Sequence, residues 1–218
     1  MKTRFSLLII ILFISSTSLF SQFRFSYGGK LGGASTNLTG VGLKDFIPAP
    51  KVKFVGGLIT NFAYGSRFAL QIEALYSGKG SAFKYYADNS IYVGKASIEE
   101  KLGYFAVPVI LQFKMGDKDN YFHFDGGIVY NTLVHDKYNG TIIITDDKGN
   151  EIEQEMTIEE DPAKTDLSWA IGIGLVANGL NFDFRYEIGT DAVFQQKEGN
   201  PQINNRSFQV TVGYTLVY

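Results

Sequence analysis

The side chains best suited to chemistry are ionisable residues that recur at alternate positions within otherwise apolar segments. They are balanced in sign: Arg24, Lys30, Lys114 and Arg185 stand against Glu73, Asp125, Asp183 and Glu187. Buried charges are rarely left unpaired. If these residues face one enclosed space, we therefore expect Arg24, Lys30 and Arg185 to pair with the acids and to plug it. A narrow ion path or a solute site is the alternative use of the same residues.

Histidine and serine provide a second candidate chemistry. His123 stands two residues before Asp125, while His135 ends the same segment and Ser168 begins the next one. An acyl-transferring or ester-cleaving protein would place a histidine close to a serine, and His135 and Ser168 could approach each other. Nothing in their spacing distinguishes such a pair from chance. We therefore predict that the protein is not an enzyme and has no catalytic residues and no cofactor.

Residues 136–165 form the most distinctive polar segment, with nine acidic residues and three lysines. Its centre predicts a hairpin, with residues 141–145 and 151–158 flanking a turn at 146–150. Clustered carboxylates attract divalent cations, but the spacing of a calcium-binding loop is absent. We expect an exposed contact surface or a simply solvated loop, and no metal site.

The elements that position these residues are eight segments in which apolar and polar residues alternate, the pattern of β-strands. In each segment one face is apolar and free of charged residues, whereas the ionisable residues fall on the other face. A soluble barrel would have the opposite arrangement, and a basic residue facing lipid at mid-membrane costs about 2–4 kcal/mol. The sequence predicts an all-β, eight-stranded, antiparallel, up-and-down transmembrane β-barrel. Its strands are expected at residues 23–33, 53–63, 68–77, 102–114, 121–134, 166–177, 180–189 and 208–218.

The connections between these segments alternate in length. Tight turns are expected at residues 64–67, 115–120 and 178–179, and the other connections are about a dozen to 30 residues long. Asn178-Gly179 is the two-residue signal of a β-hairpin. Short turns at one rim and long loops at the other are typical of bacterial outer-membrane barrels. Tyr85, Tyr86 and Tyr92 are expected to pack in a loop hairpin or at the membrane interface.

The N-terminus predicts export. Lys2 and Arg4 precede a short apolar run and a small, polar stretch, which together are typical of a secretory signal peptide over residues 1–21. Residues 22–218 would then form the barrel domain. There is no cysteine for a lipid anchor or a disulfide. The formal net charge of −2 gives no indication of nucleic-acid binding.

The final segment predicts how the barrel is assembled. Its apolar face alternates strictly and ends the sequence on an aromatic residue, a pattern that the outer-membrane barrel-assembly machinery recognises on its substrates. The expected signal comprises Phe208, Val210, Val212, Tyr214, Leu216 and Tyr218.

The sequence resembles the PorT-like outer-membrane β-barrel family of Bacteroidetes-type bacteria. The resemblance is carried by residues 68–77, Lys79-Gly80, Tyr104, Val107-Pro108, a glycine-rich first segment and the closing Val212-Gly213-Tyr214. It departs from the family at Ala106, where members commonly have an acidic residue. These are patterns of barrel construction, and Pro108 is expected at a bulge or kink. The resemblance implies a barrel in outer-membrane lipid and a link to secretion.

We therefore predict a non-enzymatic outer-membrane barrel that acts through its exposed loops in envelope structure, adhesion or secretion, with envelope or secretion proteins as candidate partners. The alternative is a narrow channel or small-solute transporter, followed by a lipid-active enzyme.

Overall fold

A computed structural model describes residues 23–40, 47–89, 92–145, 151–156, 162–191 and 203–217. The predicted signal peptide, the turn at 146–150 and Tyr218 lie outside these residues. The described chain forms eleven strands: β1 (Phe23–Gly40), β2 (Ile47–Ala49), β3 (Lys51–Tyr64), β4 (Phe68–Lys79), β5 (Ala82–Asn89), β6 (Tyr92–Gly116), β7 (Asn120–Thr145), β8 (Glu151–Met156), β9 (Thr165–Ala177), β10 (Leu180–Gly189) and β11 (Ile203–Val217). Within the described ranges, no helix is long and apolar enough to cross a bilayer.

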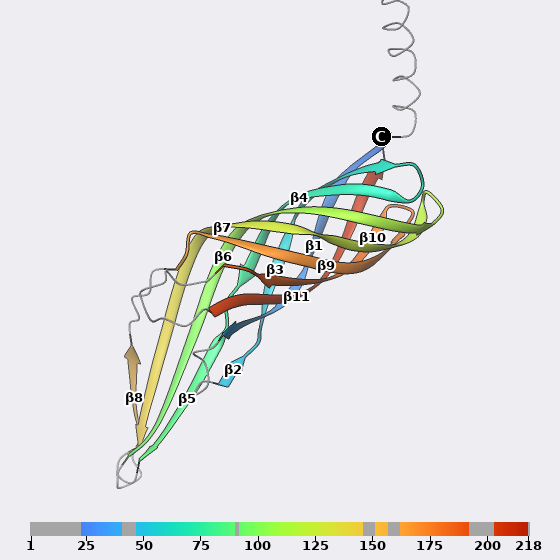
Figure 1. Ribbon diagram of the computed structural model, residues 1–218. Helices are drawn as coiled ribbons and strands as arrows, with labels where there is room; N and C mark the ends of the chain where they lie inside the picture. Colours follow the sequence, from blue (N-terminus) through green and yellow to red (C-terminus); the bar gives the residue numbers. More distant parts are fainter. Residues whose placement is uncertain are drawn as a thin grey trace, which may run out of the picture.

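Eight of these strands close into an antiparallel barrel (Figure 1). Each strand pairs with its neighbour in the order β1, β3, β4, β6, β7, β9, β10, β11, and β11 pairs back with β1. Closure pairs the backbone groups of every barrel strand on both sides, which is the condition for crossing lipid. The predicted eight-stranded fold is confirmed.

The strands extend beyond their predicted ends chiefly at one rim. β1 extends to Gly40, β6 begins at Tyr92, and β7 continues to Thr145. The sequence analysis placed these parts in loops, because alternation between an apolar and a polar face holds only where one face meets lipid. In these extensions the strands are defined by their pairing with neighbouring strands.

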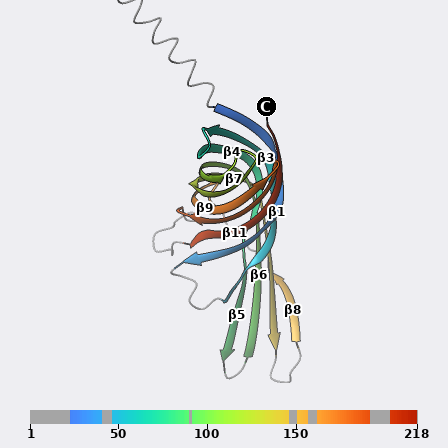
Figure 2. The same cartoon turned by 90° about the vertical axis from the view of Figure 1, so that its right-hand side faces the viewer.

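The extra lengths build a sheet that rises beyond the barrel (Figure 2). The upper part of β6 pairs with β5 on one side and with β7 on the other, while β8 pairs with β7 and β2 with β5. We call β2, β5, β8 and the parts of β6 and β7 beyond the barrel the projecting sheet. Of the hairpin predicted at 141–158, the two strands are present where the structure describes them, with residues 140–145 paired to residues 151–156 and Thr145 opposite Glu151. Tyr85, Tyr86 and Tyr92 lie in its β5–β6 hairpin.

The opposite end of the barrel, which we call the short-turn rim, carries the tight turns and the last described residues of the chain (Figure 1). Asn178 and Gly179 both have positive φ, 50° and 86°, as a type I′ hairpin turn requires. Gly65 has a φ of 60° in the turn between β3 and β4. All three predicted turns are therefore present.

The outer wall is apolar and exposed. Leu58 and Leu111 are each 68% exposed, and Trp169 is 60% exposed. Near the short-turn rim, aromatic rings pack on this face: Phe23 and Tyr64 have ring centroids 5.2 Å apart. An apolar exterior of this extent requires lipid around it.

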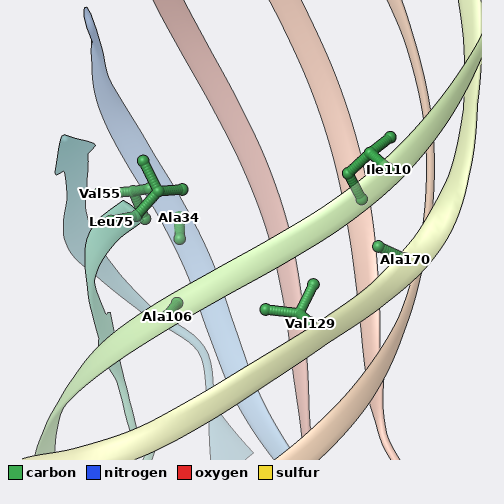
Figure 3. Packing of buried hydrophobic residues seen from close by; sticks show 7 residues of the cluster. All are labelled: Ala34, Val55, Leu75, Ala106, Ile110, Val129 and Ala170. Atoms are coloured by element: carbon green, nitrogen blue, oxygen red, sulfur yellow. The ribbon is translucent and has the colours of Figure 1, made fainter. Parts of the chain in front are cut away.

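The inward face contains more apolar side chains than predicted. Seven small or medium residues form a buried cluster inside the barrel (Figure 3): Ala34, Val55, Leu75, Ala106, Ile110, Val129 and Ala170. The sequence analysis expected a polar interior. In an eight-stranded barrel, however, side chains fill the lumen whatever their polarity, and small apolar residues pack among the charged ones.

Pro108 lies opposite Val129 of β7, where the β6–β7 ladder is regular. The register shift in that ladder is at Gly103/Tyr104, so of the bulge or kink expected at Pro108 the bulge is wrong. On its other side, the ladder between β4 and β6 skips from the Ile72–Val109 pair to the Leu75–Ala106 pair. This gap accommodates the missing N–H of proline without a bulge.

Candidate functional site: the charged lumen

Glu73 is the shared partner in a buried network of ion pairs and hydrogen bonds in the lumen. The Arg185 guanidinium donates to both of its oxygens, over 2.9 Å from Nη1 and 2.8 Å from Nη2. Lys30 Nζ lies 2.8 Å from Glu73 Oε2, and Gln71 Nε2 donates to Oε1 over 2.6 Å. All four side chains are buried. A carboxylate with two cations and an amide donor is a compact buried network, and its bidentate arginine is the strongest kind of such contact.

A second buried group lies on the side of the projecting sheet. Lys79 Nζ is 3.4 Å from Asp166 Oδ2 and 3.6 Å from Glu187 Oε2. Asn205 Nδ2 donates to the same Asp166 oxygen over 3.4 Å, and Asn131 Nδ2 donates to the Asp166 carbonyl over 3.1 Å. The sequence analysis expected Glu187 to pair with Arg24, Lys30 or Arg185. In the structure its ion-pair partner is Lys79. The sequence analysis missed Lys79 and Asp166, although extending the alternation of β4 by one step would have placed Lys79 inward.

Towards the short-turn rim lies the third group, which we call the His123 cluster: His123, Asp125 and Asp183. His123 Nδ1 is 2.7 Å from Asp125 Oδ1, and His123 Nε2 is 3.4 Å from Asp183 Oδ1. The three residues come from β7 and β10, with β9 between them. Gly174 of β9 lies opposite both His123 and Asp183, and a Cβ at Gly174 would be 2.3 Å from His123 Nε2. Glycine is required there because the imidazole crosses the intervening strand.

Amide side chains connect this end of the lumen to the central network. Asn61 Nδ2 donates to Gln112 Oε1 over 2.6 Å and to Gln71 Oε1 over 3.1 Å. Lys114 Nζ donates to Asn61 Oδ1 over 3.3 Å and lies 4.3 Å from the centroid of the Tyr121 ring. A continuous polar network thus runs from the short-turn rim to Glu73.

Arg24 departs from the expected pairing. Its Nη2 lies 2.6 Å from Asp119 Oδ1 in the turn between β6 and β7, and its Nη1 donates to the Lys118 carbonyl over 2.9 Å. Both charged side chains are partly exposed at the rim. The hydrogen bond from Arg24 lowers the pKa of the Asp119 carboxyl below its usual value. The prediction that Arg24 pairs with acids of the lumen is wrong, because the first inward position of β1 already lies at the rim.

The histidine–serine pair considered for catalysis is not brought together. His135 is exposed, and its ring stacks on Tyr76 of the outer wall with centroids 6.1 Å apart. Ser168 is fully buried in the lumen, opposite Val129 of β7, and donates to Asp166 Oδ2. The barrel wall lies between the two side chains.

Two adjoining cavities open the lumen at the short-turn rim. The outer cavity is lined by Arg24, Lys114, Asp119 and Tyr121, among others, and the inner one reaches Gln71, His123 and Asp183. The inner lining does not include Glu73 or Arg185. We call the two together the vestibule.

The closing strand β11 lies between β1 and β10. Of the residues expected in the assembly signal, Phe208, Val210, Val212, Tyr214 and Leu216 are exposed on the outer wall. Tyr218 is outside the described residues.

Comparison with known proteins then identifies the family. Residues 20–195 match the model of the outer membrane protein beta-barrel domain, which covers most of the chain. The protein belongs to this family. Its apolar outer wall and closed eight-stranded barrel agree with this assignment, and the protein is an outer-membrane barrel.

Solved structures that resemble this chain are also found. Ail of Yersinia pestis, solved with the heparin analogue sucrose octasulfate, is 9% identical with a TM-score of 0.41, and the match covers 88% of this chain and 99% of that one. Neisserial surface protein A is 10% identical with a TM-score of 0.35, over 87% and 96% of the two chains. OprG of Pseudomonas aeruginosa is 10% identical with a TM-score of 0.31, over 89% and 95%. No curated protein matches the sequence.

Proposed function

We propose that this protein is a non-enzymatic outer-membrane barrel that acts through its projecting sheet, in envelope structure, adhesion or as an accessory of secretion. The observation that carries the proposal is the length of two strands. β6 and β7 have 25 and 26 residues, whereas a strand needs about 9–11 residues to cross the bilayer. More than half of each strand is therefore available outside the membrane.

The charge of the sheet indicates how it would contact a partner. β8 is its outer strand beside β7 and carries three acids, Glu151, Glu153 and Glu155. Charged residues along an edge strand oppose pairing with a foreign strand. We therefore expect side chains, rather than backbone pairing, to make the contact, and a basic surface on the partner.

The chemistry of the lumen supports a role outside it. Glu73, Arg185 and Lys30 close the centre of the barrel with direct ion pairs. A channel at this position would require these contacts to break, at the cost of uncovering buried charges. The vestibule is the observation that favours the second candidate, a narrow channel or solute transporter.

We further propose that residues 1–21 direct export and are removed, that the short-turn rim faces the periplasm, and that β11 and Tyr218 are recognised by the barrel-assembly machinery. We also propose that the protein is related to the PorT-like barrels and therefore has secretion proteins as partners.

Deleting Tyr218 should reduce the heat-modifiable band that marks an assembled barrel in gels, whereas Tyr218→Phe should preserve it. Full assembly of the deletion variant would contradict this part.

The main test removes the projecting sheet and keeps the barrel. Residues 80–101 and 136–164 are replaced together by short glycine- and asparagine-containing turns, and assembly is monitored by heat-modifiability. We expect an assembled barrel that has lost surface binding, co-purifying envelope proteins or normal secretion. A trimmed barrel that retains all of these functions would contradict the proposal.

Recording in planar bilayers separates the proposal from the channel alternative. The intact protein should give no reproducible conductance steps, whereas stable steps that change in Glu73→Gln would favour a channel. For the enzyme alternative, His135→Ala should leave the lipid profile of the cell envelope unchanged.

A further inference from the structure

We propose that the His123 cluster is a binding site for a divalent transition-metal ion, reached through the vestibule. The site would use His123 Nε2 and the Asp183 carboxylate as direct ligands, Asn181 as a third, and Asp125 as the group that orients the imidazole. One ligand atom from each of His123, Asp125 and Asp183 lies within 4.8 Å of the others. This inference goes beyond the proposed role of the projecting sheet and is independent of it.

The two contacts of the imidazole differ in a way that points to an ion. His123 Nδ1 lies 2.7 Å from Asp125 Oδ1, and because an ionised carboxylate can only accept, we assign the proton of the neutral ring to Nδ1. In the neutral ring, Nε2 then carries a lone pair. That lone pair faces the Asp183 carboxylate, so a cation or a second proton is required between the two atoms.

The separation of these atoms favours the metal over the proton. Nε2 and Asp183 Oδ1 are 3.4 Å apart, beyond the range of about 2.7–3.2 Å for N–H···O hydrogen bonds. Two ligands at about 2.0–2.2 Å from a tetrahedral zinc ion would themselves be about 3.4 Å apart. Orientation of a ligating histidine by a carboxylate on its other nitrogen is the usual arrangement at metal sites.

An unsatisfied polar atom provides independent evidence. Asn181 precedes Asp183 by two positions on the same inward face of β10 and lines the inner cavity with His123 and Asp183. The residue is 6% exposed, and its Oδ1 has no hydrogen-bond partner among the described residues. A buried amide oxygen without a donor is costly. A bound cation would satisfy it, whereas a proton on His123 would not.

The donors indicate the class of ion. An imidazole with carboxylate and amide oxygens suits zinc and other divalent first-row metals, while magnesium and calcium prefer all-oxygen sites. Among the described residues, the inner cavity adjoins the outer cavity at the short-turn rim, and its lining does not reach the Glu73 network. The ion would therefore enter and leave at that rim and would be held there without crossing the barrel.

Calorimetric titration with Zn²⁺ tests the inference, using the full mature chain refolded in detergent without a polyhistidine tag. We expect one saturable site in the native protein. His123→Ala should abolish it, Asp183→Asn should weaken it strongly because a neutral amide oxygen replaces the carboxylate, and Asp125→Asn should weaken it by about 10–100-fold. Every variant is first checked for heat-modifiability. His135→Ala is the matched control, since it removes the other histidine from the same strand but on the outer wall.

The visible spectrum of bound Co²⁺ provides a second readout, which would not change if the residues of the His123 cluster had only a structural role. Co²⁺ bound at a site with an imidazole ligand should show visible absorption bands in the native protein and in His135→Ala, and none in His123→Ala. Excess Mg²⁺ or Ca²⁺ should not displace the bound Co²⁺ from the native protein. The inference is overturned if the native chain binds no Zn²⁺, if His123→Ala and Asp183→Asn bind it as the native chain does, or if binding is lost in His135→Ala. Unchanged binding in the first two variants would show that the ion binds elsewhere on the protein.

Discussion

At the scale of single residues, Glu73 determines the charge balance of the lumen. It is the shared partner of Arg185 and Lys30, and its removal takes from both buried cations the ion pair that the described residues provide. The ion pairs are contacts between β1, β4 and β10, strands that are distant in the sequence. The alternation of side chains predicts that these residues face inward. It does not predict which of them meet across the lumen, because that depends on the tilt of the strands in the closed barrel.

Glu73→Gln should therefore destabilise the barrel strongly. Removing one partner of a buried ion pair typically costs about 3–5 kcal/mol. Urea unfolding in lipid vesicles, followed through the heat-modifiable band, would measure the loss. Glu153→Gln is the matched control, because Glu153 is exposed on β8 and its change should leave the midpoint of unfolding unaltered. Equal stability of the two variants would contradict the role given to Glu73.

The rim pair provides a prediction about pH. Arg24 lowers the folded-state pKa of Asp119 below its ordinary value of 3.8, so the ionised carboxylate favours the folded state. This contribution is present above the ordinary pKa and is lost as the pH falls through the lower, folded-state value. In an NMR titration, the Asp119 carboxyl should have its midpoint at a lower pH in the native protein than in Arg24→Ala. Identical midpoints would show that the contact is absent in solution.

At the scale of elements, the sequence predicts the faces of the strands well and their ends poorly. Every strand expected within the bilayer is present, because lipid on one side enforces strict alternation. Above the bilayer this constraint ends. The run Ile142-Ile143-Ile144 does not alternate, yet it lies in β7, where it is paired with both β6 and β8. Pairing between strands, rather than burial against lipid, defines the projecting sheet.

A charge scan along the wall should reveal this boundary. Ile171→Arg places a basic residue on the lipid-facing side of β9 and should destabilise the barrel by about 2–4 kcal/mol if it lies near the bilayer midplane. Ile152→Arg makes the same change on β8, at a side chain of nearly equal exposure, and should have almost no effect. Unfolding in vesicles by urea measures both variants. Similar costs at the two positions would contradict the placement of β8 outside the membrane.

At the scale of the whole molecule, an apolar wall surrounds a packed, charged interior, and the projecting sheet extends from one rim. This distribution is the inverse of a soluble barrel. It explains why large side chains such as Leu58 and Trp169 are exposed, while Glu73 and Arg185 are buried. Lipid must therefore contact the outer wall along the barrel strands.

Trp169 allows a direct measurement of this claim. It is the only tryptophan in the sequence and is 60% exposed on the outer wall of β9, so its fluorescence needs no added label. The protein is refolded into vesicles whose lipids carry bromine on their acyl chains, and its emission is compared with that in unbrominated vesicles. We predict blue-shifted emission that is strongly quenched by the brominated lipid and barely affected by iodide in the water. Emission quenched by iodide and unchanged by bromine would contradict the lipid-facing wall.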